Sequence, residues 1–225
     1  MKKPGLRPAN RAARLKFARD HRHWTVDDWR KVVWTDETSV TTASGPAPVW
    51  VFRKPWEKLH PGCILPTYKS GACTAMMWGA FQGSKKGPMV RCPDGKITSK
   101  KYIQLLEEHA LPWLSTLGDD AVFMQDNCSV HKSKETTALL ESKGLHPLRW
   151  PPQSPDLNPI ENLWFILKCT LHKRYPSLGT LPGGPAARRV YLEEYMMGCW
   201  DEIGEDLLEK YVASMPTRIK MVLKA

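Results

Sequence analysis

The segment Trp150-Pro151-Pro152-Gln153-Ser154-Pro155-Asp156-Leu157-Asn158-Pro159-Ile160-Glu161-Asn162-Leu163-Trp164 is the most informative stretch of this chain. Its prolines set a rigid turn, and Asn158 followed by Pro159 is typical of a helix start. Apolar residues then recur at helical spacing and predict a buried helix face: Ile160, Leu163, Trp164, Leu167 and Leu171. Glu161 lies at the border of that face, so the segment places a carboxylate at the start of an amphipathic helix.

Two further carboxylates close predicted strands. Asp126 follows the apolar run Val122-Phe123-Met124-Gln125, and Asp36 follows Val32-Val33-Trp34-Thr35. Such runs are typical of buried strands, and the functional side chains of open α/β sheets gather where strands end. Asp36 competes with its neighbour Glu37, because strand alternation sends the two side chains to opposite faces. Three acids that each close an element indicate one site.

Two of the three acids also have a purely structural explanation. Glu161 at the third helical position could complete a capping box with Asn158. Asp126 could open a turn over Asn127 to Lys132, because Asp-Asn favours turns. Spacing alone does not separate these alternatives from catalysis.

Three blocks resemble the catalytic domain of mariner-superfamily transposases: Trp34-Thr35-Asp36-Glu37-Thr38, Gln125-Asp126-Asn127 followed by His131, and the proline-rich segment above. The 34 residues between Asp126 and Glu161 match the interval of one large branch of that superfamily. The resemblance covers nearly the whole chain from about Arg11 onward, and its motif selects Asp36 over Glu37. It implies a ribonuclease-H-like α/β fold, a mixed five-stranded sheet flanked by helices and preceded by a basic N-terminal helical arm. It also implies that Asp36, Asp126 and Glu161 are the catalytic triad.

The chemistry of three clustered acids requires cations. Clustered carboxylates repel one another, and Mg²⁺ prefers carboxylate oxygen. Two ions about 4 Å apart can activate a water or a 3′-hydroxyl and stabilise the leaving oxygen. We expect two Mg²⁺ ions, replaceable by Mn²⁺, with Asp36 bridging both and Asp126 and Glu161 each holding one. His131 and Asn127 are candidates for contacting the phosphate or ordering the site, although a lone histidine more often satisfies a local hydrogen bond.

Positive charge is concentrated at the beginning of the chain. The net charge is +10, and residues 1–31 hold ten Lys or Arg against three acids. A basic arm on a nearly neutral body is typical of a protein that binds phosphate backbones, although a solvated basic helix is the alternative. The candidate backbone contacts are Arg7, Arg11, Arg14, Lys16, Arg19 and Arg22.

We expect residues 1–30 to form the arm and 31–225 the catalytic domain, with a clamp-like loop at 42–70 and a flexible insertion at 176–187.

The remaining pattern predicts alternating elements. We expect strands at 31–36, 49–52, 72–81, 89–92, 122–125 and 145–150, the last two parallel. Helices are predicted at 10–22, after Thr25, at 99–111 up to Pro112, from Ser133 to Gly144, from Pro159, and from Arg188 with a break at Pro216.

The resemblance implies DNA transposition: hydrolytic cleavage at transposon ends, then joining of the 3′-hydroxyl to TA target DNA by a homodimer assembled on DNA in the nucleus. The family's paired helix-turn-helix modules are not in this sequence, and Ser39-Val40 and the 176–187 insertion depart from its pattern.

Scattered cysteines predict a reducing compartment, and no apolar run or leader predicts a membrane or export. The alternatives are an idle DNA-binding or interaction protein and a ribonuclease-H-like nuclease or resolvase.

Overall fold

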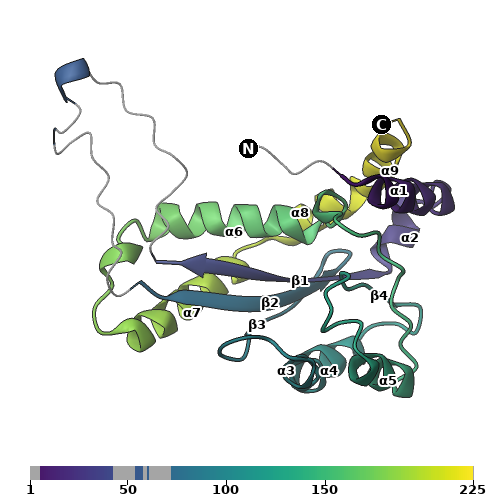
Figure 1. The fold of residues 1–225 in the computed structure, drawn as a ribbon, viewed down its shortest axis with the longest axis horizontal. Helices are drawn as coiled ribbons and strands as arrows, with labels where there is room; N and C mark the ends of the chain where they lie inside the picture. The colour runs from purple at the N-terminus through teal and green to yellow at the C-terminus, as the bar shows by residue number, and fades with distance from the viewer. Residues whose placement is uncertain (1–5, 43–53, 58–59, 61–71, 225) are drawn as a thin grey trace.

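A mixed sheet forms the centre of the computed structural model, which describes residues 6–42, 54–57, 60 and 72–224 (Figure 1). Four strands have the order β3-β2-β1-β4 in the described part of the chain. β1 pairs antiparallel with β2 and parallel with β4. The strands are β1 Val32–Thr41, β2 Thr74–Gln82, β3 Lys85–Arg91 and β4 Val122–Phe123.

The central strand β1 carries the first acid. Val32, Val33 and Trp34 are fully buried, as the apolar run predicts. The strand is longer than expected and continues to Thr41, because the antiparallel ladder with β2 extends along the whole strand. Along this extension exposed Ser39 alternates with buried Val40, as a half-buried strand requires.

The strand expected at 145–150 is not formed, and the described sheet has four strands rather than the predicted five. The N–H of Leu148 donates to the carbonyl oxygen of Phe123 at 2.8 Å, so the segment runs beside β4. Pro147 lacks the N–H that a regular ladder needs, and Pro151 ends the segment. β4 is correspondingly shorter than the predicted 122–125.

Helices cover both faces of the sheet (Figure 1). One face packs against α6 and α7, and this core extends to the helices at the two ends of the described chain. This layer contains α1 Pro8–Asp20, α2 Val26–Arg30, α6 Ile160–Arg174, α7 Pro185–Asp201, α8 Glu205–Ala213 and α9 Met215–Lys224. The second core lies against α3 Ser99–Leu105, α4 Leu111–Leu114 and α5 Lys134–Ser142. No helix in the described residues is long and apolar enough to span a membrane.

Several predicted boundaries are confirmed and others are wrong. Ser133 caps α5, and Gly144 follows it with a φ of 68°. The helix at 99–111 does not stop at Pro112, because a π turn over Leu106–Ala110 leads into α4, whose first turn accommodates the proline. α7 begins at Pro185 rather than Arg188.

Of the two predicted appendages, the clamp-like loop 42–70 and the insertion 176–187, the structure describes only the insertion in full. The predicted strand at 49–52 and most of the clamp-like loop 42–70 lie outside the described residues. The 176–187 insertion contains a 3-10 turn, Leu178–Thr180, and buries Leu178 and Leu181 in the core. Part of the insertion is therefore packed.

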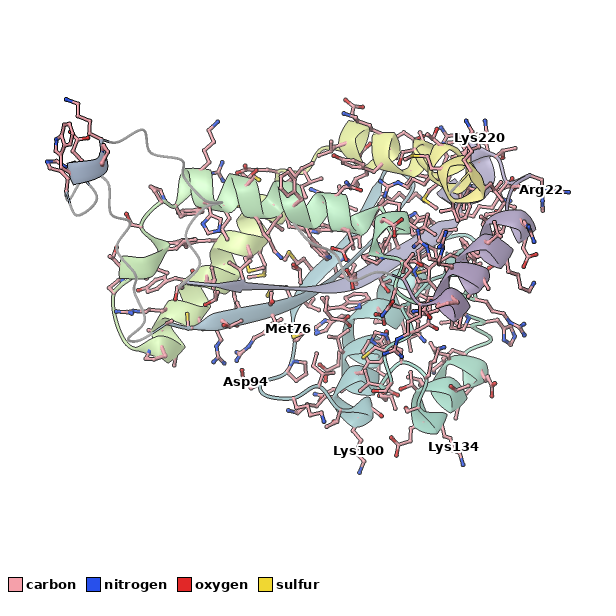
Figure 2. All side chains as sticks on the ribbon, turned by 45° about the horizontal axis from the view of Figure 1, so that its top comes forward. Arg22, Met76, Asp94, Lys100, Lys134 and Lys220 are labelled. Atoms are coloured by element: carbon pink, nitrogen blue, oxygen red, sulfur yellow. The ribbon has the colours of Figure 1, made fainter. Side chains whose placement is uncertain are left out.

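The basic arm is docked on the body. In α1, Phe17 and Ala18 are buried, and Phe17 packs edge-on against Trp150 at 5.2 Å between ring centroids. α1 lies beside α9, and Figure 2 shows Arg22 and Lys220 projecting outward at this end of the molecule.

Candidate active site

Asp36 points from β1 toward α6. The indole N–H of Trp164 donates to Asp36 Oδ2 at 3.2 Å. Gly79 of β2 is the cross-strand partner of Asp36, and a Cβ added to Gly79 would lie 2.6 Å from Trp164 Cη2. The glycine therefore provides the space in which the indole reaches the carboxylate.

Glu161 lies in the first turn of α6, and Asn158 fixes where that helix starts. The side-chain amide of Asn158 donates to the carbonyl oxygen of Thr35 at 3.3 Å, and its Oδ1 accepts from the N–H of Ile160 at 3.3 Å. Asn158 is buried. It thereby ties the beginning of α6 to the residue that precedes Asp36.

Asp126 lies in the loop after β4. Its Oδ1 accepts from the N–H of Cys128 at 2.8 Å and lies 2.7 Å from His131 Nδ1. Asn127 donates to the carbonyl oxygen of Trp150 at 2.7 Å, which ties this loop to the start of the proline-rich segment. The turn geometry predicted for Asp126 therefore coexists with its place in the site.

One cavity of about 520 Å³ brings the three acids together. Asp36, Asp126 and Glu161 all line it, and the remaining wall is formed by Asn127, Cys128 and the proline-rich segment. Within the described residues, no three His, Cys, Asp or Glu side chains lie close enough together to form a ready-made metal site. The acids thus share a cavity without forming a closed cluster.

The electrostatics of the cavity favour a cation. Burial, and then the charges of Glu161 and Glu37, raise the pKa of Asp36 from 3.8 to about 8. Hydrogen bonds from the Glu37 backbone and Trp164 oppose this rise, but both donors are neutral. A divalent cation would relieve the repulsion between Asp36 and the two glutamates. Carboxylates are the ligands that Mg²⁺ and Mn²⁺ prefer, so the donor set fits such an ion.

His131 is buried beside Asp126. It is 5% exposed and does not line the acidic cavity. Burial alone would lower its pKa, but hydrogen bonds with Asp126 and Glu37 outweigh burial and raise it to about 10. The same contact with His131, outweighing burial, lowers the pKa of Asp126.

The predicted backbone-binding residues of the arm have two different environments. Arg14 is 8% exposed and forms a bidentate pair with Asp156 at 2.7 and 2.6 Å, so it supports the fold. The other five are exposed: Arg7, Arg11, Lys16, Arg19 and Arg22. Lys16 also pairs with Asp20.

Sequence reasoning missed a residue that supports the turn before Glu161. Arg218 of α9 donates to the carbonyl oxygen of Asp156 at 2.7 Å and to Asn162 Oδ1 at 2.6 Å. Arg14 and Arg218 therefore both donate hydrogen bonds to the turn η4, Pro155–Leu157, just before α6. These contacts span more than fifty residues of sequence, so no local pattern announces them.

A mixed sheet between helical layers, with three acids lining one cavity, defines a ribonuclease-H-like protein with an acidic site. Residues 31–181 match the family model described as DDE superfamily endonuclease. The chain is 32% identical to the transposable element Tc1 transposase of Caenorhabditis elegans over 226 residues, covering 100% of this chain and 79% of that protein.

Solved structures agree on the fold. The Mos1 transposase paired-end complex with left transposon end has a TM-score of 0.72 at 14% identity, covering 100% of this chain and 66% of that one. The Mos1 catalytic domain with raltegravir and Mn has a TM-score of 0.65 at 13% identity, covering 99% and 96%. The chain belongs to the DDE superfamily endonucleases, and it is the catalytic domain of a Tc1/mariner-type transposase.

Proposed function

We propose that this domain hydrolyses DNA at transposon ends and joins the resulting 3′-hydroxyl to TA target DNA, with two divalent cations held by Asp36, Asp126 and Glu161. One observation carries the proposal: three acids from β1, the loop after β4 and the start of α6 line a single cavity. Mg²⁺ is the proposed ion, with Mn²⁺ as a substitute. Structures of the Mos1 catalytic domain are described with Mn and with Mg.

The roles of the residues follow from their positions. When bound, the cations would supply activation of the attacking oxygen and stabilisation of the leaving oxygen. Asp36, Asp126 and Glu161 would hold the cations, and the Trp164 indole orients Asp36 Oδ2. Asn127, anchored to Trp150, shapes the wall of the cavity.

DNA is the proposed partner. Exposed Arg7, Arg11, Arg19 and Arg22, in α1 and next to its two ends, supply backbone contacts. The Mos1 paired-end complex contains a transposon end, which supports binding of transposon ends here. We further propose that the chain acts as a homodimer assembled on DNA, in the nucleus.

A nicking assay tests the proposal. Supercoiled plasmid carrying candidate transposon ends is incubated with the chain and Mn²⁺ or Mg²⁺, beside Asp36→Asn, Asp126→Asn and Glu161→Gln. Each substitution should lower the rate at least about 100-fold, or roughly 2.7 kcal/mol, because it removes a metal ligand. Asp206→Asn, which removes an exposed acid in the first turn of α8, is the matched control and should nick like the wild type.

Other outcomes identify the alternatives. DNA binding without metal-dependent nicking would indicate an idle DNA-binding protein. Cleavage of RNA/DNA hybrid or junctions, but not of duplex DNA, would indicate a nuclease or resolvase instead.

A further inference from the structure

Glu37 lies next to Asp36 but reaches the site from the other face of the sheet. Alternation along β1 turns Asp36 toward Trp164 of α6 and Glu37 toward the opposite layer. There the side chain of Glu37 is 15% exposed, and its Oε1 lies 3.4 Å from His131 Nε2. A carboxylate in this position needs a polar partner, and His131 supplies it.

The imidazole of His131 bridges two acids. Its Nδ1 lies 2.7 Å from Asp126 Oδ1, while its Nε2 faces Glu37. Each ring nitrogen faces one carboxylate, so a single ring lies between the two acids. Glu37 is thereby connected to Asp126 although β1 and the loop after β4 are far apart in sequence.

The His131 ring is held by packing against Tyr102 and by a hydrogen bond to the His131 backbone. Tyr102 of α3 packs on it with ring centroids 4.2 Å apart. Gln125 donates to the carbonyl oxygen of His131 at 3.1 Å and accepts from the Tyr102 hydroxyl at 2.9 Å. Tyr102, Gln125 and His131 are all buried, so the ring has little freedom to turn.

Asp126 itself is not fixed by burial. Its side chain is 52% exposed, and its carboxylate is oriented by the Cys128 N–H and by His131. An exposed carboxylate that must meet a cation in one orientation loses rotamer freedom when it binds. A fixed imidazole reduces that cost before the cation arrives.

We propose that Glu37 is a positioning residue: through His131 it holds the Asp126 carboxylate in the orientation that binds a divalent cation. This inference rests on the proposed function, because it assumes that Asp126 is a metal ligand. It gives both acids of the Asp36-Glu37 pair a role, one as a ligand and the other as support for a ligand. Partners of this kind behind a metal ligand typically contribute 10- to 100-fold in affinity.

Mn²⁺ titration calorimetry on the full chain tests the proposal. Glu37→Ala should weaken Mn²⁺ binding about tenfold or more. Glu37→Gln keeps an oxygen that accepts from His131 and should restore most of that loss. Glu193→Ala is the matched control, because Glu193 is also buried but pairs with Arg91 of β3. It should bind Mn²⁺ like the wild type.

A double substitution separates positioning from a general structural effect. In an Asp126→Asn background, Glu37→Ala should change Mn²⁺ affinity less than about twofold, because the group it positions is gone. An equal loss in both backgrounds, or a Glu37→Ala variant that matches the Glu193→Ala control, would overturn the inference. If Asp126→Asn alone leaves Mn²⁺ binding unchanged, the proposed metal site fails instead. Should Glu37→Ala not fold, Glu37→Leu and His131→Asn carry the same comparison.

Discussion

The partly buried carboxylate of Asp36 makes the stability of the metal-free domain depend on pH. Its pKa in the folded protein is about 8 because burial and the nearby acids Glu161 and Glu37 disfavour its charge, whereas the ordinary value is 3.8. The folded state therefore keeps a proton that the unfolded state has released. The contribution of the Asp36 carboxyl group to the free energy of unfolding is fully present below pH 3.8 and is lost as pH rises through about 8.

We therefore expect Asp36→Asn to stabilise the metal-free domain progressively as pH rises from about 4 to 8. The gain over wild type should grow by at most about 1.4 kcal/mol per pH unit. Urea unfolding in EDTA at several pH values across this range measures it. Parallel stability profiles for the two proteins would show that Asp36 is ionised in the folded state.

Gly79 controls the space beside Asp36. A methyl group there would meet Trp164 at 2.6 Å and push the indole away from Asp36. Gly79→Ala should lower the free energy of unfolding by about 1 to 3 kcal/mol and reduce nicking. Gly198→Ala in α7, where a Cβ meets nothing within 4 Å, is the control and should be neutral or slightly stabilising. Unfolding and nicking measured on both variants decide whether the space at Gly79 matters.

At the scale of elements, α1 is part of the folded body as well as a carrier of charge. Deleting residues 1–22 removes buried Phe17 and leaves Asp156 without the Arg14 guanidinium. We expect the deletion to cost at least about 3 kcal/mol of stability, the typical loss for one buried Phe. Urea unfolding of the truncated and full chains measures this. Equal stability would mean that the docking of α1 contributes nothing.

The elements also show what a sequence reveals and what it hides. The helix from Pro159 and the cap of α2 at Thr25 were predictable, because periodicity and capping residues act within a few positions. The strand predicted at 145–150 is not formed, because Pro147 offers no N–H to a ladder and the segment keeps the single hydrogen bond from Leu148 to Phe123. The three acids were predictable from motifs, but Glu37, Gly79 and Trp164 act through contacts between distant segments.

At the scale of the whole molecule, the net charge of +10 makes DNA binding sensitive to salt. Arg7→Gln/Arg11→Gln/Arg19→Gln/Arg22→Gln removes four exposed charges while leaving Arg14 in place. The logarithm of affinity should fall more gently with the logarithm of salt concentration, with a slope smaller by up to about 3.6, or about 0.9 for each phosphate that is no longer neutralised. Fluorescence anisotropy on a labelled duplex from about 50 to 200 mM salt, concentrations that span the sensitive range, gives both slopes. An unchanged slope would place the DNA elsewhere on the surface.

Arg14 and Arg218 come from the first and last described helices, and both donate hydrogen bonds to Asp156 in the turn just before Glu161. A transposon copy whose reading frame is interrupted after α8 would still encode Asp36, Asp126 and Glu161, yet its product would lack the Arg218 contacts. We expect such a copy to be silent even though a motif search would count it as intact. Among decaying copies in a genome, position 218 should therefore be inspected together with the three acids.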